Sequence, residues 1–256
     1  MKLLPIASLS RPLPQHLWEA HVCDFVAEVM GGVPFVIAGN SIGGGIASGV
    51  ASNLRELCCG LVLCNSAGVL QEPEDYVRPS VSVGRQTALG QLPKAYSPLP
   101  LVGQRGLDCF GEVVISAIFP SIPARLADIY SERPQNADAR LAFAIEQGAA
   151  FPGSANVIGS GQKLPPQRPL NEVLDTVDGF AGPVLVPQGR NDRVSGAELA
   201  QSRAATLARL RPGVSVQLID GGHCVQDDSP EAVAAAVLQW LPETKAWAAS
   251  MALGTP

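Results

Sequence analysis

The stretch "FVIAGNSIGG", residues 35–44, decides the fold that this sequence predicts. Its first four residues are an apolar run bounded by Pro34 and Gly39, which is typical of a short buried strand. A Gly-Asn-Ser-Ile-Gly turn follows, and a glycine- and alanine-rich segment then continues to about Leu57 as a predicted helix. Strand, sharp turn and helix in this order form the setting in which G-x-S-x-G presents a nucleophilic serine.

Ser41 is the candidate nucleophile of this turn. The turn would hold the serine in strained dihedral angles, so the residues two positions away must lack bulk to avoid colliding, and Gly39 and Gly43 meet that need. The same geometry would direct the serine hydroxyl away from the sheet, and the backbone N–H of Ile42 toward an oxyanion. An ordinary loop serine is the alternative, and the pentapeptide alone does not decide between them.

Composition limits the class of protein. The chain has 256 residues, 46% of them hydrophobic, which suffices for one large domain or one domain with a substantial insertion. The formal net charge is −5, and there is no block of like charges, so we expect no nucleic-acid partner. The apolar stretch 113–124 is short for a membrane span and contains Pro120 and Pro123, so we expect no transmembrane segment.

The cysteines show neither a paired metal-ligand spacing nor an accompanying secretory signal. We therefore expect reduced and mostly buried thiols, with no disulfide, no metal and no cofactor. The six positions are Cys23, Cys58, Cys59, Cys64, Cys109 and Cys224.

Predicted strands and helices alternate along the chain. The apolar runs predict four buried strands, at 34–38, 60–65, 183–189 and 215–220. Further helices are predicted over 15–30, over 196–211 and from Pro230 onward, with Ser229 as the N-cap of the last. This alternation indicates a parallel sheet whose strand carboxyl ends form the functional rim.

Residues 70–180 differ from the rest of the chain. Prolines are frequent, no strand-like run stands out, and short helical stretches alternate with Gly/Pro loops. We expect a helical lid here, inserted into an α/β core made of residues 1–69 and 181–256.

A serine hydroxyl needs a base to take its proton and a carboxylate to orient that base. His223 follows the last predicted strand in "DGGHCVQDDSPE", and Asp192 follows the preceding strand in "PQGRNDRV". Asp192 alone could equally be a turn residue. However, Ser41, Asp192 and His223 each follow a predicted strand and occur in the chain order Ser…Asp…His, which favours a catalytic triad.

Other histidines and carboxylates compete for these roles. His16 and His21 lie in the first predicted helix and are interpreted as ordinary helix residues. Asp220 lies beside the histidine loop at the end of a strand, whereas Asp227 and Asp228 lead into the last helix.

The blocks "GNSIGG", "GPVLVPQGRNDRV" and "GGHCVQDDSPEAVAAAVLQWL" resemble the elbow, acid and histidine blocks of the α/β-hydrolase superfamily. Within it, the chain is most similar to pheophytinase-like hydrolases of plants and algae over about 16–242. The resemblance implies an α/β-hydrolase fold, Ser41 as nucleophile, His223 as general base and Asp192 as its orienter, with Asn40 as an elbow neighbour. It also implies a chloroplast location; otherwise a cytoplasmic one is expected.

The sequence departs from that family before the elbow. Family members usually place some four strands there, and the loop after the third provides a second oxyanion donor. Only 40 residues precede Ser41, so we expect the N-terminal strands to be missing. Residues 34–38 would then form an unpaired sheet edge open to self-association. With the Ile42 N–H as the remaining donor, the rate would fall by about 10²–10³.

Three functions are considered. The first is a serine hydrolase that cleaves an ester of a hydrophobic substrate, pheophytin-like or another long-chain ester, because the lid is rich in Leu, Ile, Val and Pro. The second is C–C bond hydrolysis of dienoic diketo acids by the same triad, with Arg78, Arg105 or Arg125 binding the acid. The third is a catalytically impaired relative that acts by binding.

Overall fold

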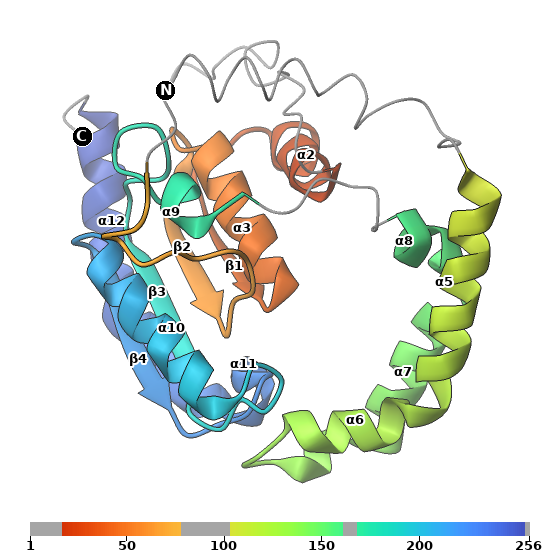
Figure 1. The fold of residues 1–256 in the computed structure, drawn as a ribbon. Coiled ribbons are helices and arrows are strands. Elements are labelled where there is room, and N and C mark those ends of the chain that lie inside the picture. Colours follow the sequence, from red (N-terminus) through yellow and green to blue (C-terminus); the bar gives the residue numbers. More distant parts are fainter. Residues whose placement is uncertain (1–16, 78–102, 161–167, 254–256) are drawn as a thin grey trace.

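The computed structural model describes residues 17–77, 103–160 and 168–253. These residues form a parallel four-stranded sheet in the order β1-β2-β3-β4 (Figure 1). Helices cover both faces of the sheet, and a separate group of helices lies to one side. The predicted parallel α/β architecture is confirmed.

The strands are apolar segments, which suits parallel strands covered on both faces. They are β1 (Phe35–Asn40), β2 (Cys58–Cys64), β3 (Val184–Gly189) and β4 (Val214–Ile219). Every residue of β2 and β3 is buried, whereas β1, one of the two outer strands of the described sheet, leaves Val36 44% exposed. All four predicted strands are confirmed, with ends that differ by at most two residues.

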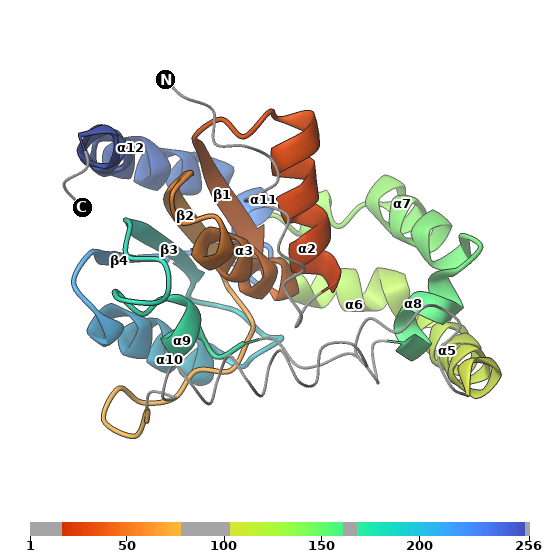
Figure 2. The ribbon, with the colours of Figure 1, turned by 90° about the horizontal axis from the view of Figure 1, so that it is seen from above.

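The sheet lies between two layers of helices. On one face lie α3 (Ile42–Asn53), α9 (Leu170–Val173) and α10 (Ala197–Leu210), and on the other lies α12 (Pro230–Ala252) (Figure 2). The core of the first layer includes fully buried side chains from strands, helices and a loop: Val50, Leu61, Leu63, Leu174 and Phe180. The second layer is centred on Val62, Leu185, Val233 and Trp240.

Two helix ends differ from expectation. The predicted helix over 15–30 is described from α2 (Leu17–Asp24) onward and passes into a π-helical turn, η1 (Phe25–Val29). Ser229 occupies the N-cap position of α12, but its hydroxyl donates to the Asp220 carbonyl and does not cap the helix. The short α11 (Val225–Asp228) precedes it.

The described part of the predicted lid from Gln104 to Ser160 forms a cap of helices between β2 and β3, whereas residues 78–102 and 161–167 lie outside the described residues. Its elements are α5 (Gln104–Ile118), η2 (Phe119–Ser121), α6 (Ile122–Ile129), η3 (Pro134–Asn136), α7 (Ala139–Ala150) and α8 (Ser154–Ser160). The cap curves away from the sheet and meets the core near α11 (Figure 1). By contrast, Leu170, Val173 and Phe180 pack in the core, so this segment belongs structurally to the α/β domain although the sequence placed it in the lid.

One run of helix in the described ranges is long and apolar enough, by length and composition alone, to cross a membrane. It is the 26-residue run Gln104–Ile129. Pro120 and Pro123 do not interrupt it, contrary to the sequence argument, because each lies in the first turn of a helical element, where proline is tolerated. In the structure this run packs against α7 and α8 as part of the cap.

Candidate active site

Ser41 lies at the junction of β1 and α3, on the rim formed by the carboxyl ends of the strands. Its φ of 52° lies in the left-handed region, where a residue other than glycine is strained. Main-chain hydrogen bonds hold it there: Ser41 N donates to Cys64 O at 3.1 Å, and Ala67 N donates to Ser41 O at 2.8 Å. Ile42 follows as the first residue of a 12-residue helix, whose dipole favours negative charge at this end.

The glycines around Ser41 are not equivalent. A Cβ atom on Gly39 would lie 2.1 Å from the carbonyl oxygen of Gly43, so this position has no room for a side chain. A Cβ atom on Gly43 would meet nothing within 4 Å, so this position, unlike Gly39, has room for a methyl group. The second close approach involves Gly44, whose Cβ would lie 2.4 Å from that of Ser66.

His223 and Asp192 form a buried pair on the same rim. Nδ1 of His223 lies 3.1 Å from each carboxylate oxygen of Asp192. The exposed fraction is 9% for His223 and 1% for Asp192. A carboxylate at Nδ1 fixes the ring so that the other ring nitrogen can accept a proton, as a general base requires.

Asn65, at the end of β2, holds Asp192 from the other side. Its Nδ2 donates to Asp192 Oδ2 at 3.0 Å, and its Oδ1 accepts from Gly189 N at 2.8 Å. Burial by itself raises the pKa of Asp192, but hydrogen bonds from His223, Asn65 and Val194 outweigh it and leave that pKa below its ordinary value. The carboxylate is therefore ionised at neutral pH.

Asn40 links the elbow to the histidine loop. Its Nδ2 donates to Cys64 O at 3.1 Å and to the main-chain oxygen of His223 at 2.9 Å. Ser41 and His223 both lie in the described ranges, and no hydrogen bond joins them there. Catalytic hydrogen bonds are often long without substrate and tighten in its complex, so the arrangement remains suited to a triad.

The competing carboxylates have other partners. Asp220 is 78% exposed at its side chain and pairs with Arg190 at 3.1 Å. Asp227 accepts from the Tyr130 hydroxyl at 2.6 Å, and Asp228 accepts from backbone N–H groups. Within the described residues, Asp192 is the carboxylate bonded to the ring of His223.

The remaining candidates are apart from this rim or outside the described residues. His21 is exposed on α2, as expected of an ordinary helix residue. Arg105 and Arg125 are exposed on the cap. His16 and Arg78 lie outside the described residues.

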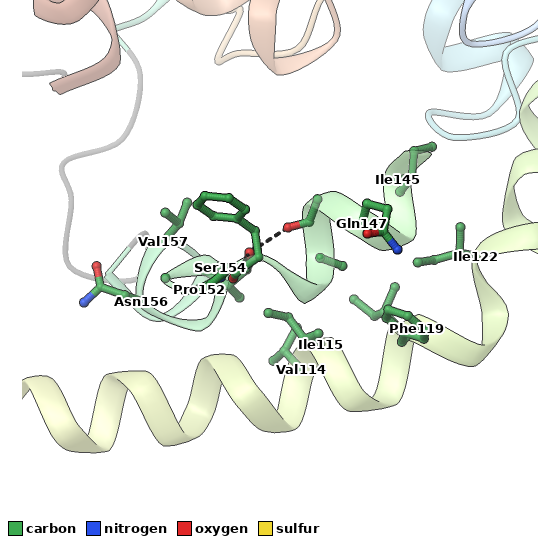
Figure 3. Close-up of a pocket in the computed structure, with 16 residues that line it drawn as sticks. Val114, Ile115, Phe119, Ile122, Ile145, Gln147, Pro152, Ser154, Asn156 and Val157 are labelled. Atoms are coloured by element: carbon green, nitrogen blue, oxygen red, sulfur yellow. Dashed lines mark hydrogen bonds between the residues drawn. The ribbon is translucent and has the colours of Figure 1, made fainter. Parts of the chain in front are cut away.

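The cap contains a cavity of about 950 Å³ between α5 and the α7–α8 segment (Figure 3). Ile115 and Phe119 line it on one side and Ile145 lines it on the other, and Phe151 is also among its lining residues. Among the described residues that line it there is neither a charged side chain nor any of Ser41, Asp192 and His223. The cavity is suited to an apolar group, and it belongs to the cap rather than to the rim.

The cysteines and other metal-ligating side chains form no second site. In the described ranges, no group of three or more His, Cys, Asp or Glu side chains could hold a metal ion. Burial raises the pKa of Cys58 to about 12, which makes that thiol unreactive. The thiols of Cys23, Cys58, Cys59 and Cys64 are buried. Cys224 is half-buried, and Cys109 is exposed.

The contacts that Asn65 and Asn40 make at the site were not predicted from the sequence. Asn65 ends a predicted strand, so its place on the rim was a usable signal. No sequence signal pointed to the bond from Asn40 to the His223 main chain, because that bond joins residues 183 positions apart.

Solved structures with the same fold support this architecture. A thermophilic esterase from Thermogutta terrifontis is 20% identical, with a TM-score of 0.54 over 90% of this chain and 74% of that one. A meta-cleavage product hydrolase from Pseudomonas fluorescens is 18% identical, with a TM-score of 0.57 over 88% and 71%. A membrane phospholipase A, a bacterial virulence factor, is 20% identical, with a TM-score of 0.57 over 92% and 66%.

At these identities the similarity shows the fold. No curated protein sequence matches this chain closely enough to count as a relative. The family model described as "Alpha/beta hydrolase family" matches residues 7–236, which is most of the chain. This match agrees with the parallel sheet and the strained serine at the end of β1, and the chain belongs to the alpha/beta hydrolase family.

Proposed function

We propose that this chain is a serine hydrolase that cleaves a carboxylic ester of a hydrophobic substrate through an acyl-enzyme. The observation that carries the proposal is the buried His223–Asp192 pair on the same rim as Ser41. A strained serine at a strand–helix turn and a carboxylate-oriented imidazole are the two parts that nucleophilic acyl transfer needs.

In the proposed reaction, Ser41 Oγ attacks the ester carbonyl while His223 takes the hydroxyl proton. The bond from carbon to the alcohol oxygen then breaks, and the histidine returns the proton to the departing alcohol. Water, deprotonated by His223, then attacks the acyl carbon. The bond from that carbon to Ser41 Oγ breaks, the acid leaves, and His223 returns the proton to Ser41 Oγ. Asp192 stays ionised and stabilises the imidazolium in both steps.

The negative charge that develops on the carbonyl oxygen needs hydrogen-bond donors. We assign the backbone N–H of Ile42 to this role because it follows Ser41 at the start of α3. The helix dipole acts in the same direction.

The character of the cap supports an apolar substrate. Its cavity is lined by aliphatic and aromatic side chains, and apolar residues also lie on its surface, among them Phe110, Val113, Phe143 and Phe151. Ligand sites for apolar molecules have this composition. Pheophytin-like esters and a chloroplast location are the finer proposal, which rests on the resemblance of the three motif blocks.

The position of the cap arginines favours an ester over a diketo acid. C–C hydrolysis of an acidic substrate would need a cation facing the substrate. Arg105 and Arg125 are exposed, and neither lines the cavity.

A fluorophosphonate probe tests the proposal, because it reacts with serines activated by a histidine. Wild type should be labelled at Ser41, and Ser41→Ala and His223→Ala should not be. His21→Ala, which changes an exposed histidine, should be labelled like wild type.

A panel of esters with increasing acyl length, ending with pheophytin, then defines the substrate. Activity should rise with apolar chain length. A well-folded wild type that stays unlabelled would contradict the proposal and would favour the binding function.

A further inference from the structure

The side chain of Asp228 joins the histidine loop to the cap. It is fully buried at the end of α11. Its Oδ2 accepts from Gly222 N at 2.6 Å and from Ser131 N at 2.9 Å. Its Oδ1 accepts from Arg133 N at 2.6 Å and from Glu132 N at 3.1 Å. One carboxylate thus binds the residue before His223 and three successive residues that follow α6.

These bonds use the acceptor capacity of the carboxylate. An ionised carboxylate has two oxygens and about four lone-pair sites, and four backbone N–H groups together with the Ser131 hydroxyl fill them. Hydrogen bonds to a charged acceptor are stronger than neutral ones. The segments therefore have a strong common anchor even though they lie far apart in the sequence.

The main chains of the two segments also touch directly. His223 N donates to the carbonyl oxygen of Ile129 at 2.9 Å. A Cβ atom on Gly222 would lie 2.2 Å from that same oxygen, so only glycine fits between them. The His223 main chain is thus bonded to the cap through its nitrogen and to Asn40 through its oxygen.

We propose that Asp228 is a positioning residue, which clasps cap residues 129–133 to the loop 221–223 and so holds His223 in register with Asp192 and Ser41. This inference rests on the proposed function for its effect on catalysis. The clasp itself is a property of the structure and can be tested without turnover. A further consequence is that this end of the cap and the histidine loop move together.

The test compares Asp228→Asn with Glu231→Gln. The first variant places an amide among backbone donors, where its NH₂ group has no acceptor. The second makes the same chemical change at an exposed residue that pairs with Arg133, and it leaves the clasp intact. Asp228→Glu keeps the carboxylate and serves as the conservative variant if Asp228→Asn folds poorly.

Three measurements are made on each variant: thermal unfolding, the rate of fluorophosphonate labelling at Ser41, and hydrogen–deuterium exchange of peptides covering 129–133 and 221–224. In Asp228→Asn we expect labelling to slow by about 10²-fold in folded protein, as misplacement of a catalytic group by about 1 Å can do. With a soluble ester the loss should fall on kcat rather than KM. Asp228→Glu should recover part of the rate, and Glu231→Gln should match wild type.

Exchange should rise in both peptides together in Asp228→Asn. Wild-type labelling rates in folded Asp228→Asn would overturn the positioning role. If wild type itself is not labelled, the proposed function fails, and the clasp is then tested by hydrogen–deuterium exchange alone. The clasp is disproved if exchange in Asp228→Asn rises in only one of the two peptides or in neither.

Discussion

The side chain of Asn40 is bonded to the main chain of His223, at 2.9 Å from Nδ2 to the carbonyl oxygen. The residue before the candidate nucleophile therefore fixes the loop that carries the candidate base. Its second bond, to Cys64 O, ties both to the end of β2. The side-chain amide of Asn40 thus connects the turn at Ser41, the end of β2 and the loop that carries His223.

Replacement of Asn40 by alanine should affect both stability and labelling. The carbonyl oxygen of His223 would lose its donor, whereas Cys64 O keeps the bond from Ser41 N, and we expect a cost of about 1–3 kcal/mol in the free energy of unfolding. Labelling of Ser41 should slow further than the unfolded fraction explains, because His223 is released. Asn53→Ala is the matched control, since Asn53 bonds with Glu19 and Arg168 away from the rim. Equal labelling in both variants, measured beside urea unfolding, would contradict a special role for Asn40.

The strands and the order of the three site residues could be predicted because their signals are local. Each strand is a short apolar run, and parallel strands bring their carboxyl ends to one rim. Ser41, Asp192 and His223 each follow such a run, so no long-range information was needed to place them on the same edge.

The supporting contacts could not be predicted, because they join segments far apart in the sequence. Asp228 binds Ser131 across 97 positions, and a sequence pattern carries no record of that pairing. The rule that proline interrupts a helix also gave a wrong expectation, because it holds in the helix interior and not in the first turn. Pro120 and Pro123 were expected to interrupt the apolar run, yet each fits the first turn of a helical element.

The pH dependence of stability should report on Asp228. Burial by itself raises the pKa of this carboxyl, but backbone N–H groups of Gly222, Ser131, Arg133 and Glu132 outweigh it and leave the pKa below its ordinary value of 3.8. The unfolded carboxyl takes up its proton near 3.8 and the folded one only at lower pH. The contribution of Asp228 is therefore complete above this value and is lost as pH falls through the folded pKa.

Urea unfolding of wild type and Asp228→Asn, from neutral pH to below 3.8, checks this. Wild type should be more stable by about 3 kcal/mol at neutral pH, because the variant leaves buried donors without a charged acceptor. That difference should shrink on acidification. A constant difference across the series would show that the carboxyl does not titrate with a lowered pKa.

The outer position of β1 leads to a prediction about association. Val36 is 44% exposed on β1, one of the two outer strands of the described sheet, and such edges can pair with another chain. We propose self-association through this edge, so the sedimentation coefficient of wild type should rise with concentration. Val36→Lys should suppress the rise, whereas Val194→Lys, a change at a 58% exposed valine outside the sheet, should not. A wild type that stays monomeric throughout would disprove the edge contact.

Gly39 and Gly43 occupy the matching ends of the G-x-S-x-G motif, yet the structure predicts opposite effects for their replacement by alanine. At Gly39 the new Cβ would lie 2.1 Å from a backbone oxygen, and because backbone yields little, we expect a loss of about 1–3 kcal/mol. At Gly43 the Cβ meets no atom within 4 Å and the residue is helical, so alanine should be neutral or stabilise by up to about 1 kcal/mol. Urea unfolding measures both, and Ser41 labelling should survive in Gly43→Ala alone. Equal losses would show that the turn needs glycine at both positions, as the G-x-S-x-G motif by itself suggests, and that α3 is held more tightly against the turn than its contacts indicate.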